Sequence, residues 1–179
     1  MDTLGKNIMI VGCAGSGKST LARRLGEILD LRVIHIDKMY WQSGWVMRPP
    51  EKRQKLIAEA ISEDGWVFDG KNTSTYPMRV ARAHSLIWLD LPRRRCFPRV
   101  LWRIATAYGR TRSNMADGCP ERFDREFLEW VWNFDRDSRS KIERLFAETK
   151  QSLHQYRFCN QCQIDDFLGE LVERNSIAR

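Results

Sequence analysis

Residues 12–19 read Gly12-Cys13-Ala14-Gly15-Ser16-Gly17-Lys18-Ser19 and fit the pattern GxxxxGK[ST]. The stretch follows the apolar run Ile8-Met9-Ile10-Val11 and is continued by residues 20–29, which predicts a strand before the loop and a helix over 18–29. Glycines let such a loop curl so that backbone N–H groups and the start of the helix converge on phosphate oxygens. The stretch therefore predicts a phosphate-binding loop; a plain glycine-rich turn between strand and helix is the alternative.

The residues of this motif also predict which ligand the loop binds. In this motif the lysine, here Lys18, reaches the β and γ phosphates, and the following hydroxyl, here Ser19, is suited to ligate Mg²⁺. Thr20 is less well placed for the metal. We therefore expect a nucleoside triphosphate, ATP, as ligand and Mg²⁺ as cofactor. The residues expected to bind ATP are Gly12, Cys13, Ala14, Gly15, Ser16, Gly17, Lys18, Ser19 and Thr20.

Along the rest of the chain, short apolar runs alternate with stretches of helical pattern, as in an α/β protein with a mainly parallel sheet. We expect strands over residues 7–11, 32–36, 66–68, 85–89 and 155–159. Helices are expected over residues 18–29, 51–62, 97–108, 121–148 and 164–173. In the long helix the apolar residues from Phe123 to Phe134 recur at helical spacing, which predicts one inward-facing side.

Length and composition limit the class of protein. The chain has 179 residues, 42% hydrophobic and 30% charged, which predicts a single globular domain over 1–179. No early apolar run is long enough for a signal peptide or a membrane span, so we expect a cytoplasmic protein without membrane contact. The five cysteines are then expected to be reduced thiols.

Positive charge is concentrated in one segment. Seven arginines and no acid lie between residues 92 and 112: Arg93, Arg94, Arg95, Arg99, Arg103, Arg110 and Arg112. Three of them, Arg95, Arg99 and Arg103, share one face of a helix. The segment then enters a flexible stretch, which favours a lid over about 109–122 whose arginines close over the transferring phosphoryl group. Arg136 and Arg139 are weaker candidates for the same task. A solvated charged face is the alternative, and no base-reading motif supports specific nucleic-acid binding.

Two classes of phosphate-binding-loop protein do not fit. A GTPase should carry the guanine signature NKxD, which is missing here, and a motor should have an apolar strand that ends in Asp-Glu, whereas residues 86–90 end in Leu89-Asp90. The order of parts instead resembles the small kinases of the adenylate kinase and shikimate kinase superfamily. The pieces are residues 12–19, 31–37, 65–70 and 86–92, followed by the arginine-rich helix.

A closer likeness comes from Asp37-Lys38-Met39-Tyr40-Trp41 with Trp45, from Asp69-Gly70, and from Trp130-Val131-Trp132-Asn133-Phe134. With the pair Arg99 and Arg103, these pieces resemble the adenylate kinase-related DNA topology modulation (FlaR-related) proteins over nearly the whole chain. Where adenylate kinases continue past Asp-Gly with Phe-Pro-Arg, this chain reads Lys71-Asn72-Thr73.

The resemblance implies a P-loop NTPase three-layer sandwich with a five-stranded parallel sheet in the order 2-3-1-4-5, helices on both faces and an arginine-rich helical lid. It implies that Asp69 faces the Mg²⁺, with a turn or helix-cap aspartate as the alternative. Asp90 is then structural. His35, His84 and His154 lack partners at catalytic spacing and are expected to be structural too.

The resemblance also places the acceptor in the loop over about 37–50, where the candidate binding residues are Asp37, Tyr40, Trp41, Trp45 and Arg48. Flat aromatic rings beside an arginine suit a ring-bearing anion; packing of the tryptophans onto the core is the alternative. The catalytic candidates are Lys18, Arg99, Arg103 and Asp37, the last as proton acceptor if the acceptor is a hydroxyl. The metal ligands are Ser19 and Asp69. The expected function is phosphoryl transfer from Mg-ATP to a small-molecule acceptor of nucleotide type. The alternative is an ATP-binding regulatory protein associated with DNA topology, without kinase activity.

Overall fold

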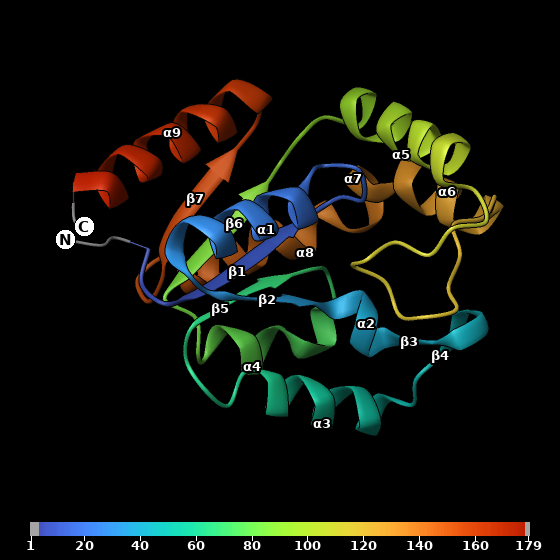
Figure 1. The fold of residues 1–179 in the computed structure, drawn as a ribbon, viewed down its shortest axis with the longest axis horizontal. Helices are drawn as coiled ribbons and strands as arrows, with labels where there is room; N and C mark the ends of the chain where they lie inside the picture. Colours follow the sequence, from blue (N-terminus) through green and yellow to red (C-terminus); the bar gives the residue numbers. More distant parts are fainter. Residues whose placement is uncertain (1–3, 178–179) are drawn as a thin grey trace.

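The core of the protein is a five-stranded parallel sheet, in a computed structural model that describes residues 4–177. The strands are β1 Asn7–Gly12, β2 Arg32–His35, β5 Trp66–Asp69, β6 Ser85–Leu89 and β7 His154–Phe158. They lie in the order β2-β5-β1-β6-β7 (Figure 1). The two-residue strands β3 Trp41–Gln42 and β4 Val46–Met47 form a separate hairpin. When only the five strands of the main sheet are numbered along the chain, their order is 2-3-1-4-5, so the predicted order is confirmed.

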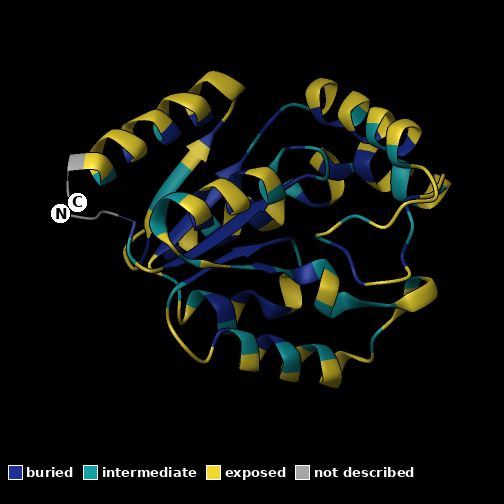
Figure 2. Cartoon of the chain, viewed as in Figure 1, coloured by how far each residue is buried: buried dark blue, intermediate teal, exposed yellow. Residues whose placement is uncertain are grey.

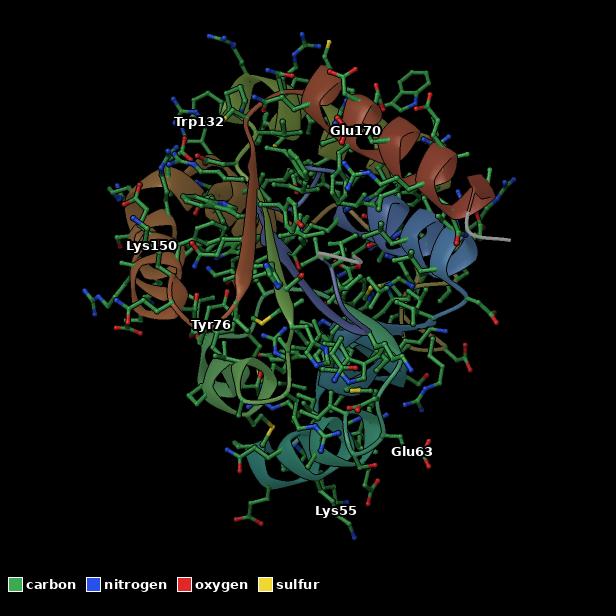
Figure 3. The ribbon with its side chains drawn as sticks, turned by 90° about the vertical axis from the view of Figure 1, so that its left-hand side faces the viewer. Lys55, Glu63, Tyr76, Trp132, Lys150 and Glu170 are labelled. Atoms are coloured by element: carbon green, nitrogen blue, oxygen red, sulfur yellow. The ribbon has the colours of Figure 1, made fainter. Side chains whose placement is uncertain are left out.

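Helices cover both faces of this sheet. Successive side chains of β1 point to opposite faces: Ile8 and Ile10 pack with helices α1 Lys18–Leu29 and α9 Gln161–Ile177, whereas Met9 and Val11 belong to the cluster on the other face. That second cluster includes residues of α3 Pro50–Ala60, α4 Tyr76–Val80 and α5 Arg93–Ala107. The central strands are buried along their length (Figure 2), and the two helical layers lie on either side of the sheet in Figure 3. The predicted three-layer fold is confirmed. Within residues 4–177, no helix combines the length and the apolar character that a membrane crossing requires.

The prediction of a single long helix over 121–148 is wrong. Three helices replace it: α6 Arg125–Trp132, α7 Phe134–Asp137 and α8 Arg139–Thr149. The first begins later than expected because the Asp124 side chain accepts a hydrogen bond from the Phe127 N–H, as an N-cap does. The expected inward face is correct only in part, since Val131 and Phe134 are buried but Phe123 is exposed.

The loops that carry the candidate site meet at the carboxyl edge of the parallel strands. The stretch 37–50, expected as a loop, contains most of α2 Ile36–Tyr40, then the β3–β4 hairpin around the 3-10 turn Ser43–Trp45. A second 3-10 turn, Thr73–Thr75, leads into α4. The lid expected over 109–122 is a loop between α5 and α6, so the helical part of the expected arginine-rich lid is α5 alone. Its base is closed by backbone hydrogen bonds from Gly109 N to Glu121 O (2.9 Å) and from Glu121 N to Arg110 O (2.9 Å).

Candidate active site

The phosphate-binding loop links the end of β1 to the start of α1. Gly15 has φ of +77°, and a Cβ there would lie 2.4 Å from the Cys96 carbonyl oxygen of α5, so only glycine fits. The Lys18 ammonium donates a hydrogen bond to the Cys13 carbonyl oxygen at 2.7 Å, and the buried Ser16 hydroxyl has no protein partner. Cys13 itself is buried, whereas Thr20 is exposed at the rim of the cavity described below. The loop thus leaves a lysine and a hydroxyl for an anion.

Ser19 and Asp69 lie together at the end of the sheet. The Ser19 Oγ donates to Asp69 Oδ2 at 2.5 Å, although the two residues are fifty positions apart in the chain. Asp69 is 4% exposed, and its other oxygen, Oδ1, is buried without a hydrogen-bond partner. A hydroxyl and a carboxylate oxygen are ligands that Mg²⁺ accepts, the remaining positions being filled by water and phosphate oxygens. The residues present therefore fit a magnesium ion.

His35 is a site residue that the sequence reasoning missed. Its Nδ1 lies 3.0 Å from Asp69 Oδ2, and it lines the cavity. The expectation that it only supports the fold overlooked the order of the strands: His35 ends β2, Asp69 ends the adjacent β5, and the two residues are register partners. Strand order alone could have found the pair. By contrast, the His84 ring nitrogen accepts from the Asn7 backbone N–H, a contact within the fold.

Asp37 lies in the first turn of α2 and faces the same cavity. Burial raises the pKa of its carboxyl, and the negative charge of Asp69 raises it further. A carboxylate with a raised pKa is a better proton acceptor near neutral pH than an ordinary aspartate.

Two arginines share one buried carboxylate above the phosphate-binding loop. Arg103 Nη2 lies 2.9 Å from Glu121 Oε1, and Arg112 Nε lies 2.8 Å from Oε2. Arg112 also donates a hydrogen bond to Asn114 Oδ1 (3.2 Å). Asn114 in turn donates from Nδ2 to Ser19 Oγ (2.9 Å). The 109–122 loop therefore reaches Ser19. The sequence interpretation considered only the arginine segment, which contains no acid. It missed Glu121, which follows that segment and pairs with both Arg103 and Arg112.

The other arginines are less central. Arg99 is exposed, lines the cavity and donates to Gln161 Oε1 at 3.2 Å, whereas the exposed Arg95 and Arg110 do not line it. Arg139 pairs with Asp90 at 2.9 Å, which gives Asp90 the structural role expected of it and keeps Arg139 away from the cavity. Arg136 pairs with its neighbour Asp137.

Aromatic rings form one side of the cavity, which we call its aromatic side. Trp41 contacts Tyr40 and Trp45 edge-to-face, with ring centroids 5.1 and 5.4 Å apart, and all three line the cavity. Phe127 and Trp130 of α6 line it as well. Arg48 is not among these residues and instead lines a separate, smaller cavity of about 320 Å³.

The β3–β4 hairpin and the 109–122 loop are joined by hydrogen bonds. Gly44 N donates to Gly118 O (2.8 Å), and the Trp45 indole N–H donates to Pro120 O (2.9 Å). Gly118 has φ of +71°, and a Cβ there would collide with Ser43. The two segments are thus in close contact.

One cavity of about 1160 Å³ brings most of these groups together. Its lining includes the phosphate-binding loop, His35, Asp37, Asp69, Lys71, the paired arginines and the aromatic rings. A volume of this size can hold a nucleotide and a second small molecule. The arrangement can hold a triphosphate at one end and present its terminal phosphate toward the aromatic side.

Comparison with known proteins agrees with this architecture. No protein-family model matches the chain. A relative from Bacillus subtilis (strain 168), the uncharacterized protein YqaC, is 25% identical over 145 residues, which are 80% of each chain. A stretch of 59 residues is 39% identical to threonine synthase-like 1 of Mus musculus, but it covers 33% of this chain and 8% of that protein.

Among solved structures, a shikimate kinase from Acinetobacter baumannii in complex with shikimate superimposes with a TM-score of 0.57 at 18% identity, over 99% of this chain and 96% of that chain. The deoxyadenosine kinase from M. mycoides gives a TM-score of 0.51 at 14% identity, over 93% of this chain and 98% of the other. The chain therefore has the fold of the P-loop small kinases.

Proposed function

We propose that the protein transfers the γ-phosphoryl group of Mg-ATP to a small-molecule acceptor of nucleotide type. The observation that carries the proposal is the single cavity that brings Lys18, Ser19, Asp69, Asp37 and the arginine pair around one space. The fold of the P-loop small kinases supports it.

In this proposal each residue acts where its position allows. Lys18 leaves the Cys13 carbonyl and contacts the β and γ phosphates, while Ser19 and Asp69 hold Mg²⁺. When bound there, the ion neutralises charge on the phosphate oxygens. Arg103 and Arg112 exchange part of their contact with Glu121 for the phosphoryl group that moves, and Arg99 closes the mouth of the cavity.

A screen of acceptors with γ-labelled ATP tests the proposal. Nucleoside monophosphates, nucleosides and small alcohols are each incubated with the protein, and labelled product is separated from ATP. We expect Mg²⁺-dependent transfer to at least one monophosphate, and transfer that is lower by about a hundredfold or more in the Lys18→Ala variant under the same conditions. If no acceptor is labelled and the protein instead binds DNA at physiological salt, the ATP-binding regulator associated with DNA topology replaces the kinase.

Asp37 distinguishes the two kinds of acceptor. An acceptor phosphate needs no strong base, so Asp37→Asn should keep turnover within about tenfold of the parent protein for a nucleoside monophosphate. The measurement is kcat for the parent and the variant with AMP, dCMP and small alcohols. A loss of several orders of magnitude with an alcohol that the parent phosphorylates well would show a hydroxyl acceptor and contradict the nucleotide assignment.

A further inference from the structure

Lys71 occupies a position in the cavity that the roles above do not use. It follows Asp69-Gly70 directly after β5 and is half-buried. Its ammonium lies 5.1 Å from the centroid of the Trp130 ring and 5.0 Å from that of Phe134. The lysine therefore lies against the aromatic side of the cavity, which we have assigned to the acceptor.

A buried arginine fixes the backbone on both sides of Lys71. Arg79 of α4 is fully buried, and it donates from Nη1 to Gly70 O and from Nη2 to Asn72 O, both at 3.0 Å. Its guanidinium packs over Phe68, and burial lowers the pKa of Arg79 to about 10. Burying a guanidinium without a carboxylate partner is unfavourable, yet here it holds the two carbonyls that flank Lys71. The lysine is thus presented from a rigid loop.

Three arginines that line the same cavity have acidic partners. Arg103 and Arg112 pair with Glu121, and Arg122 pairs with Asp124 at 3.1 Å. Within residues 4–177, the Lys71 ammonium makes no hydrogen bond or ion pair. A cation held without a counter-charge in a ligand cavity is suited to receive an anion from outside the protein.

We propose that Lys71 binds an anionic group, a carboxylate or a phosphate, of a flat acceptor that lies against the aromatic side of the cavity. The inference rests on the proposed function and narrows its acceptor to a molecule with a ring and an oxyanion. Lysine binds such groups as a point charge, and the aromatic side chains of Phe127 and Trp130, which line the same cavity, suit a planar ring.

Benzoate, a carboxylate on a flat ring, is the probe for this site. The full chain is first saturated with Mg-ADP, so that the phosphate-binding loop is filled, and benzoate is titrated by calorimetry. We expect saturable binding that Lys71→Gln weakens about tenfold or more and that Lys71→Arg restores to within about threefold. Lys141→Gln is the matched control, because this exposed lysine of α8 does not line the cavity. It should leave benzoate binding unchanged.

A second titration separates the acceptor's anion from the γ phosphate of the nucleotide. With the non-hydrolysed analogue AMP-PNP in place of ADP, the γ position is occupied, and benzoate should still bind and still depend on Lys71. Loss of benzoate binding in that state would show that Lys71 serves the γ phosphate, and this overturns the proposal. Benzoate that does not bind, or that binds Lys71→Gln as well as the parent, overturns it too. ADP affinity, measured in each variant, reports separately on the phosphate-binding loop, so failure of this inference is distinct from failure of the kinase assignment.

Discussion

Replacement of Lys18 by alanine is expected to lower phosphoryl transfer by about a hundredfold or more while the protein stays folded. The ammonium is the group placed to stabilise charge on the phosphate oxygens as the γ-phosphoryl group moves, and its present contact with the Cys13 carbonyl is exchangeable. The measurement is kcat with the best acceptor from the screen, at saturating Mg-ATP.

Lys55→Ala is the matched control for this experiment, because Lys55 is an exposed lysine on α3 that pairs loosely with Glu59 at 4.0 Å. It should leave turnover unchanged. Circular dichroism and thermal unfolding of both variants establish that they are folded. Near-normal turnover in a folded Lys18→Ala protein would contradict the assignment of residues 12–19 as the catalytic phosphate-binding loop.

The second large effect is expected at Arg103. Loss of a cation that meets the moving phosphoryl group should reduce kcat by about a hundredfold, while ATP affinity falls by less than about fivefold. Arg103→Lys tests whether the forked shape of the guanidinium matters, because lysine keeps the positive charge beside Glu121 but lacks the two parallel donors. We expect its turnover to lie between those of the parent protein and Arg103→Ala. Arg110→Ala is the control, because Arg110 is exposed and does not line the cavity.

The same two arginines separate the kinase from a DNA-associated regulator. On a nucleic-acid surface, Arg103 and Arg110 should contribute alike, and each loss should lower the slope of log affinity against log salt by about one. We expect turnover to fall steeply in Arg103→Ala alone. Equal losses of DNA affinity in both variants, with no acceptor phosphorylated by the parent protein, would favour the regulator instead.

The phosphate-binding loop and the sheet were predictable because their signals are local or depend only on order. The motif over residues 12–19 specifies a strand, a loop and a helix within a few residues, and α1 has the predicted bounds Lys18–Leu29. The strand order followed from a resemblance in the sequence of parts rather than from the strands themselves. The predicted ends of helices were less accurate where a side chain caps the helix, as Asp124 does at the start of α6.

The candidate site was predictable only where a motif names its residues. Glu121 was missed because its two arginine partners lie nine and eighteen residues away, and nothing local in the sequence marks the contact. Lys71 was noted as a departure from the adenylate kinase pattern, but its position in the cavity depends on Arg79 and on helix α6, which only the folded chain brings near. Arg48, chosen by its place beside the aromatic residues, faces a different cavity.

The hydrogen bonds between the β3–β4 hairpin and the 109–122 loop have a thermodynamic consequence for the proposed substrate binding. The hairpin holds Trp41 and Trp45, while Asn114 of the loop donates to the Ser19 hydroxyl at the nucleotide end. A molecule that orders either segment therefore orders the other. ATP should tighten acceptor binding, and by linkage the acceptor should tighten ATP binding by the same factor, of a size about 5- to 150-fold in coupled sites. The sequence in which the two substrates arrive can then change how quickly the complex assembles, but the stability of the complete complex is the same by either route.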